Sequence, residues 1–139
     1  RETDGTVTPF DLGLGGLVSS RKDFYVGRAG VARPAPTTAN RRHLVGIMMD
    51  DRALVPPPGT HLILNPEEHA PRRVVGHITS SGYSPTLHRS IALALVSAGE
   101  QHIGQTLYAL MSGDGHVAHI TAPDFLSLQD ARIGGDADE

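Results

Sequence analysis

Short apolar runs separated by turn residues dominate the chain after residue 43. Between the runs stand glycine and proline clusters such as Pro56-Pro57-Pro58-Gly59, which favour short strands over long helices. Runs at this spacing are typical of a closed or nearly closed antiparallel barrel or a sandwich. We therefore predict a mainly β fold, a six-stranded antiparallel barrel or sandwich. The predicted strands are Leu44–Met49, His61–Leu64, Arg73–Thr79, Arg89–Val96, Thr106–Met111 and His116–Thr121.

The run Ile91-Ala92-Leu93-Ala94-Leu95-Val96 alternates large residues with alanine. As a strand it would have one bulky and one small face. Helix propensity favours a helix for the same residues. However, a helix between Pro85 and Gly99 would be too short to stabilise itself, so we predict a strand.

The last two runs are joined by Ser112-Gly113-Asp114-Gly115. An Asp-Gly pair supplies the positive φ that a tight hairpin turn requires. This segment is therefore predicted to form a β-hairpin. We predict further breaks between strands at Asn65-Pro66, at residues 82–85 and at Gly99, where glycine and proline recur.

The residues before position 43 are predicted to form a loop-rich lead with one short helix. The carboxylate of Asp23 can accept hydrogen bonds from free amides of a first helical turn, which places the helix from about Phe24 to Ala32. Gly27 and Gly30 weaken this helix, and Pro34 ends it.

Composition and charge exclude several classes of protein. The chain has 139 residues, room for one domain, and no cysteine, so disulfides and thiolate chemistry are excluded. Its formal charge is −3 and its 12 basic residues are dispersed, so no nucleic-acid partner is expected. No apolar run approaches the roughly 20 residues that span a bilayer, so no membrane partner is expected either. A cytoplasmic location follows as the expectation.

Most isolated motifs have a plain structural interpretation. Gly13-x-Gly15 lacks the third glycine of a dinucleotide fingerprint, because Val18 stands there. His116 and His119 are three apart on a predicted strand, so they point to opposite faces and do not predict a metal site. Arg21-Lys22 beside the predicted helix is more informative, since two cations there can receive an anionic ligand. A solvated basic pair is the alternative.

Three blocks resemble the aminomethyltransferase family, which includes the glycine-cleavage T-protein. The first, residues 3–9, is similar to the family's acidic-x-Thr-x-Pro loop. The second is Lys22-Asp23-Phe24 followed by Gly27-Arg28. The third runs from Gly76 through Ser84-Pro85-Thr86-Leu87 to Ala94. The blocks occur in family order, and the resemblance spans residues 2 to about 133.

The resemblance implies a domain plan and a function. It implies a lead-in of the folate-binding domain at 1–42, a C-terminal barrel at 43–133 and a polar tail at 134–139. Residues 3–9 and 89–96 look most like the alpha subunit of heterotetrameric sarcosine oxidases. Such subunits use tetrahydrofolate to capture the one-carbon unit released from sarcosine, with flavin and NAD in other domains or subunits. The implied partners are the remainder of the alpha subunit and the other oxidase subunits.

The resemblance also assigns cofactor-binding positions. Lys22 matches a basic residue that approaches the folate, and Arg132 matches a C-terminal ligand-contacting position. Gly16 falls where many relatives have tryptophan, which removes an aromatic wall from the ligand site. No catalytic residue is expected in this chain, because the family's catalytic aspartate belongs to the preceding folate domain. A stand-alone aminomethyltransferase and a non-catalytic subunit-assembly module stay open as alternatives.

Overall fold

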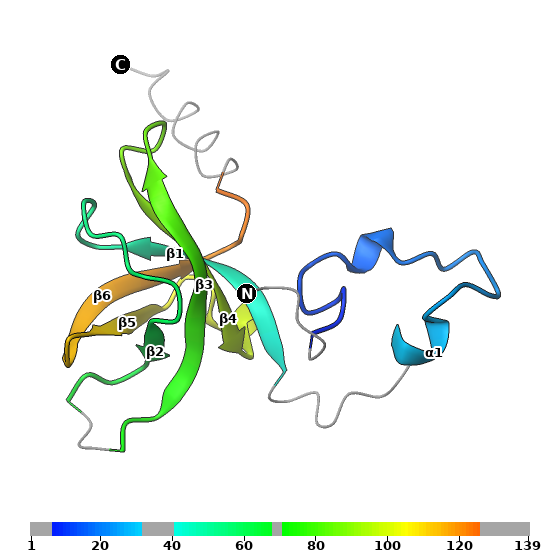
Figure 1. Ribbon diagram of the computed structural model, residues 1–139, viewed down its shortest axis with the longest axis horizontal. Helices are drawn as coiled ribbons and strands as arrows, with labels where there is room; N and C mark the ends of the chain where they lie inside the picture. The colour runs from blue at the N-terminus through cyan, green and yellow to red at the C-terminus, as the bar shows by residue number, and fades with distance from the viewer. Residues whose placement is uncertain (1–6, 32–40, 68–70, 126–139) are drawn as a thin grey trace.

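The computed structural model describes residues 7–31, 41–67 and 71–125. Within them, six antiparallel strands close into a barrel in the order β1-β4-β3-β2-β5-β6 (Figure 1). This confirms the predicted mainly β class and selects the barrel over the sandwich. The strands are β1 (Arg42–Met49), β2 (His61–Ile63), β3 (Val74–Ser84), β4 (Arg89–Ser97), β5 (Thr106–Met111) and β6 (Asp114–Thr121).

The core fills the inside of the barrel with aliphatic side chains and alanines. Inward positions alternate with outward ones along each strand, as the pleat of a strand requires. The strands β1, β4 and β6 each contribute a series of fully buried side chains at every second position. The core comprises Val45, Ile47, Met49, Leu62, Val75, Ile78, Ala92, Ala94, Val96, Leu107, Ala109, Ala118 and Ile120.

The strand β4 turns its small face into the barrel. Ala92 and Ala94 are buried members of the core, whereas Leu95 is buried but lies outside the core cluster. Ile91 and Leu93 share the outward face with Leu95. The prediction of a strand is confirmed, and the helix alternative is excluded. Alanine suits this position because the barrel interior is narrow and other strands fill it with larger residues.

The hairpin between β5 and β6 is confirmed, but its turn differs from the prediction. Met111 pairs with Asp114, so the two turn residues are Ser112 and Gly113. Both have positive φ, 52° and 94°, as the tight turns of two-residue hairpins require. Asp114 and Gly115 belong to β6 instead of the turn.

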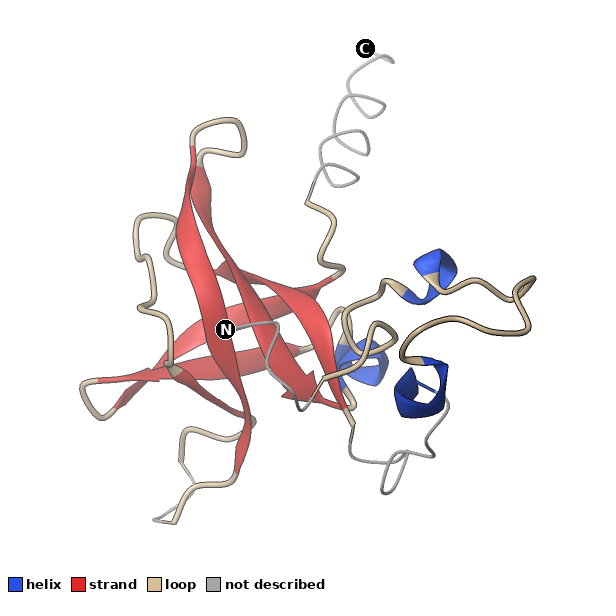
Figure 2. Ribbon diagram, turned by 45° about the vertical axis from the view of Figure 1, so that its right-hand side comes forward, coloured by secondary structure: helices blue, strands red, loops and turns tan. Residues whose placement is uncertain are grey.

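The strand β3 continues through residues that were predicted to form a turn. It extends to Ser84, and the reversal is made by residues 85–88, with His88 at φ 49°. Tyr83 pairs with Ser90 and Ser84 pairs with Arg89, so β3 and β4 continue together as a two-stranded arm (Figure 2). The register of β3 against β4 shifts between Ile78 and Ser80, and such bulges bend and twist a strand locally.

The lead before β1 contains much less helix than predicted. The helix α1 covers only Arg28–Val31, and a short 3-10 turn, η1, covers Gly15–Leu17. Gly27 adopts φ 90°, a left-handed conformation that interrupts a helix, so Asp23 does not cap one. The position of Ala32 lies outside the described residues. Figure 2 shows the described part of the lead to one side of the barrel.

A second 3-10 turn, η3 (Gly99–His102), connects β4 to β5. Across the residues that the structure describes, no helix has the length and apolar character needed to cross a membrane.

Candidate functional site

A buried ion pair fixes the lead to the barrel. The side chain of Asp11 is 4% exposed, and Arg41 Nε donates a hydrogen bond of 2.6 Å to its carboxylate. The second Arg41 contact comes from Nη2. Thr8 donates to the same carboxylate from its backbone N–H at 2.7 Å and from its hydroxyl at 2.8 Å. The backbone N–H of Leu44 also donates to the Asp11 carbonyl at 2.7 Å. The lead is therefore held against the start of β1 at Asp11.

The surroundings of Asp11 favour its ionised form. Burial alone would raise the pKa of Asp11, but the hydrogen bonds from Arg41 and Thr8 and the Arg41 charge outweigh burial and lower the pKa from 3.8 to about 2. The hydrogen bond to Asp11 in turn raises the pKa of Arg41. Both partners are thus charged at neutral pH, which is the state that makes this contact strong.

Lys22, the predicted folate-contacting residue, lies in the exposed part of the lead. Arg132 lies outside the described residues, so its role as a ligand-contacting residue stays a prediction, as do the predicted domain boundaries. Gly16 belongs to η1, and a Cβ at this position would meet no heavy atom within 4 Å. The space that a larger side chain would fill at Gly16 is therefore open.

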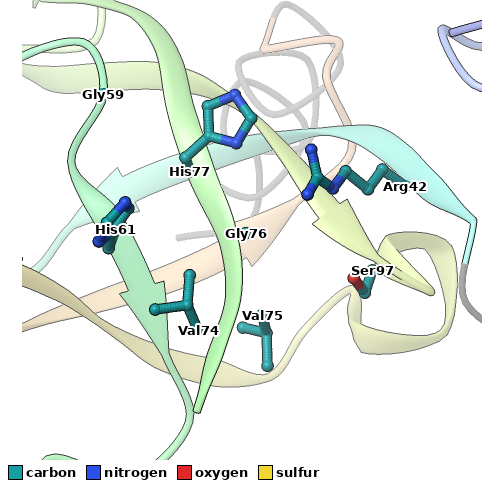
Figure 3. A pocket seen from close by; sticks show the side chains of 8 residues that line it. All are labelled: Arg42, Gly59, His61, Val74, Val75, Gly76, His77 and Ser97. Atoms are coloured by element: carbon teal, nitrogen blue, oxygen red, sulfur yellow. The ribbon is translucent and has the colours of Figure 1, made fainter. Parts of the chain in front are cut away.

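The structure brings together a polar pocket that the sequence did not reveal. Its cavity measures about 340 Å³ and lies on the outer face of the barrel (Figure 3). The pairing register explains the convergence, because Arg42 is opposite Ser97 and His77 is opposite His61. These residues come from four adjacent strands. The described residues that line the cavity are Arg42, Gly59, His61, Val74, Val75, Gly76, His77 and Ser97.

Close packing of β3 against β4 shapes one wall of this pocket. A Cβ on Gly76 would come within 2.4 Å of the Leu95 carbonyl oxygen and 2.9 Å of the Val96 Cα. Both neighbours are backbone atoms, which cannot move aside without shifting a strand. Gly76 is therefore required for the two strands to approach this closely.

A second hollow on the outer face is mainly apolar. It measures about 330 Å³ and lies beside the outward residues Ile91 and Leu93 of β4, with Pro123 and Phe125 on its other side. The ring of Phe125 lies over Gly46, where a Cβ would come within 2.9 Å of its Cζ. The Thr121 hydroxyl oxygen and the Ala122 carbonyl oxygen would lie even closer to that Cβ, at 2.4 and 2.5 Å, so glycine at position 46 makes room for all three groups.

His116 and His119 lie on opposite faces of β6, as predicted. His116 lies opposite Ala109, and His119 approaches Thr106 Oγ1 at 3.4 Å and Asp50 at 3.6 Å. In the described part of the chain, no three histidine, aspartate or glutamate side chains group together in a way that would hold a metal ion.

Comparison with known proteins places the barrel in a family. The family described as "Glycine cleavage T-protein C-terminal barrel domain" matches residues 42–126. The chain is 33% identical over 134 residues to the sarcosine oxidase subunit alpha of Rhizobium meliloti, covering 95% of this chain and 14% of that protein. It is 37% identical over 115 residues to the sarcosine oxidase subunit alpha of Corynebacterium sp. strain P-1, covering 81% of this chain and 12% of that protein.

An aminomethyltransferase of Desulfitobacterium hafniense is 32% identical over 123 residues, covering 88% of this chain and 32% of that protein. The chain thus spans between about one-eighth and one-third of the length of these relatives. The residues 42–126 that match the family contain all six strands of the described barrel. This chain belongs to the family of glycine cleavage T-protein C-terminal barrel domains, whose relatives include sarcosine oxidase alpha subunits and aminomethyltransferases.

Proposed function

We propose that this chain is the C-terminal, folate-binding region of a sarcosine oxidase alpha subunit. In the complete protein the one-carbon unit released from sarcosine would pass to tetrahydrofolate. Similarity to two such subunits over 81% or more of the chain supports this assignment, and similarity to an aminomethyltransferase over 88% of the chain keeps a stand-alone aminomethyltransferase as the alternative. The catalytic groups would come from the remainder of the alpha subunit, and flavin and NAD would bind in other domains or subunits. The assembly would be cytoplasmic.

The observation that carries the proposal is the unburied apolar surface around Lys22. Phe24 is 84% exposed, Val26 is 98% exposed and Leu17 is 81% exposed. Large apolar side chains gathered on one segment mark a surface that another part of a protein covers. Lys22 lies between Leu17 and Phe24 in the chain. If another domain of the complete protein covers these apolar side chains, the Lys22 ammonium would lie where that domain meets the lead.

The residues present fit the acidic end of a folate. A hollow of about 560 Å³ lies along residues 24–29, with the aromatic ring of Phe24 and the cation of Arg28 among its lining groups. An aromatic face suits a benzoyl ring, and ammonium or guanidinium groups suit the glutamate carboxylates attached to it. Lys22 would hold those carboxylates, and Arg132 would supply a further cation. When bound, tetrahydrofolate supplies the amine nitrogens that take up the one-carbon unit.

The complete protein provides the test. Lys22→Ala should weaken tetrahydrofolate binding about tenfold, the cost of one charge-assisted contact. Sarcosine oxidation in the absence of folate should be unchanged, and more of the one-carbon product should appear as formaldehyde. Arg52→Ala is the matched control, because Arg52 is an exposed cation in the loop after β1. Unchanged folate affinity in Lys22→Ala would show that Lys22 has no such role.

The same exposed side chains also support a second candidate, a subunit-assembly module. In that case Phe24→Ser and Val26→Ser would dissociate the complex while folate affinity stayed unchanged. Val55→Ser is the control, because Val55 is 40% exposed on a barrel loop. Sedimentation velocity of the complete assembly, combined with a folate titration, separates the two candidates.

A further inference from the structure

The outer pocket of Figure 3 concentrates positive and hydrogen-bond-donating groups. Arg42 extends from β1 toward the side of the pocket where the ring of His77 lies, and Ser97 lines the pocket near the end of β4. His61 stands on β2 directly opposite His77 on β3. The pocket therefore gathers a guanidinium, two imidazoles and a hydroxyl within a cavity of about 340 Å³.

The charge of this pocket is opposite to that of the chain. The whole sequence has 15 acidic and 12 basic residues, yet none of the described residues that line the cavity is acidic. An arginine fork donates to two oxygens at once, and each imidazole offers at least one N–H donor. Such a set recognises a planar or tetrahedral oxyanion, because each donor can address a separate oxygen.

Glycine at one lining position leaves the pocket unobstructed. Gly59 lines the pocket with φ 89°. No heavy atom lies within 4 Å of a Cβ built at Gly59, so this side of the pocket has open space. A ligand of the size of phosphate or a short dicarboxylate can therefore enter without a change of the barrel.

We propose that Arg42, His61, His77 and Ser97 form an oxyanion-binding site for a carboxylate or phosphate group. Arg42 supplies the permanent charge, while the two imidazoles and the Ser97 hydroxyl orient the bound oxygens. The site lies on the barrel and uses none of the residues assigned to folate in the lead, so it stands or falls independently of the proposed function.

The test is a titration of the ¹⁵N-labelled 139-residue chain, followed by amide and imidazole NMR signals. Inorganic phosphate and succinate are added separately, with sodium chloride at matched ionic strength as the reference. Saturable shifts are expected at Gly59 and Gly76 and at the rings of His61 and His77. Saturation by phosphate alone identifies a phosphate ligand, and saturation by succinate alone identifies a carboxylate ligand. Saturation by both shows that the site binds oxyanions of either kind.

A matched pair of arginine variants makes the result specific. Arg42→Gln should weaken binding about tenfold, the loss expected for one charged donor. Arg52→Gln should leave it unchanged, because the Arg52 carbonyl accepts from Ser90 N–H at the other end of β4. If Arg42→Gln disturbs the amide spectrum of the barrel, Arg42→Lys and His77→Gln provide the same comparison. Shifts that do not saturate, match the chloride reference or persist equally in Arg42→Gln would overturn the site.

Discussion

Asp11 and Arg41, thirty positions apart in the chain, form an ion pair at the junction between the lead and the first barrel strand. The pair closes a loop that contains Lys22 and the exposed residues around it. Because Leu44 N–H also donates to the Asp11 carbonyl, the lead is joined to β1 through both backbone and side chain. The side-chain part of this attachment therefore depends on the ionisation of one carboxyl group.

The first prediction concerns pH. The pKa of Asp11 is about 2 in the folded chain and 3.8 ordinarily, so its contribution to stability is complete above about pH 4. It is lost as the pH falls through the folded value, and the loss amounts to about 2 kcal/mol. Urea unfolding at pH 7 and at pH 2.5 measures most of this difference, because pH 2.5 lies between the two pKa values.

Asp11→Asn removes that carboxylate and should lower the unfolding free energy by about 2 kcal/mol at pH 7, with a weaker dependence on acid pH. Asp23→Asn is the control, because Asp23 is exposed in the same lead. Equal acid sensitivity of the two variants would contradict the assignment to Asp11.

The second prediction compares two glycines of β3. Gly76→Ala should destabilise the barrel by about 1 to 3 kcal/mol, because its Cβ would press on backbone atoms of β4. Gly82→Ala should be neutral or stabilising by up to about 1 kcal/mol, because nothing lies within 4 Å of its Cβ. Thermal unfolding of both variants checks the difference, and a similar loss in both would show that β3 and β4 are not in close contact at Gly76.

The third prediction concerns the turn between β5 and β6. Ser112 has φ 52°, a conformation that asparagine adopts more readily than serine. Ser112→Asn should therefore raise the unfolding free energy by about 0.5 kcal/mol. Gly113→Ala should lower it, since φ 94° disfavours any side chain. Opposite signs in a urea titration are expected, and a destabilised Ser112→Asn would contradict the two-residue turn.

The fourth prediction tests the direction of the small face of β4. Ala94 is fully buried inside the barrel, so Ala94→Leu should cost about 1 to 3 kcal/mol through overpacking. Ala53→Leu is the control, because Ala53 is exposed in the loop after β1. Differential scanning calorimetry measures both. If Ala94→Leu is tolerated as well as Ala53→Leu, the alanines do not face the core.

The strands could be predicted because their signals are local. Alternation and turn residues mark each apolar run, and the alternating run at 91–96 is a strand as expected. The extension of β3 to Ser84 could not be predicted, because Gly82 and Pro85 also occur in turns, and only pairing with β4 shows that this segment is extended. The helix begins at Arg28 and not at the predicted Phe24, because the sequence does not reveal the left-handed conformation of Gly27.

The outer pocket illustrates a different limit. Arg42, His61, His77 and Ser97 are separated by as many as 55 positions, and no single motif contains more than one of them. Their proximity follows from strand order and register, which depend on long-range pairing. Alternation alone could indicate that His61 faces outward, but the identity of its neighbours required the closed barrel.

The pairing of β1 with β6 has a consequence for how such a domain is attached to others. Gly46 lies opposite Thr121, and the two strands run in opposite directions, so the chain enters and leaves the barrel at the same end. A domain with adjacent ends can be joined to different neighbours without rearranging its own strands. The matched part of this chain occupies 14% of one relative and 32% of another, as expected for a portable unit added to proteins of very different length.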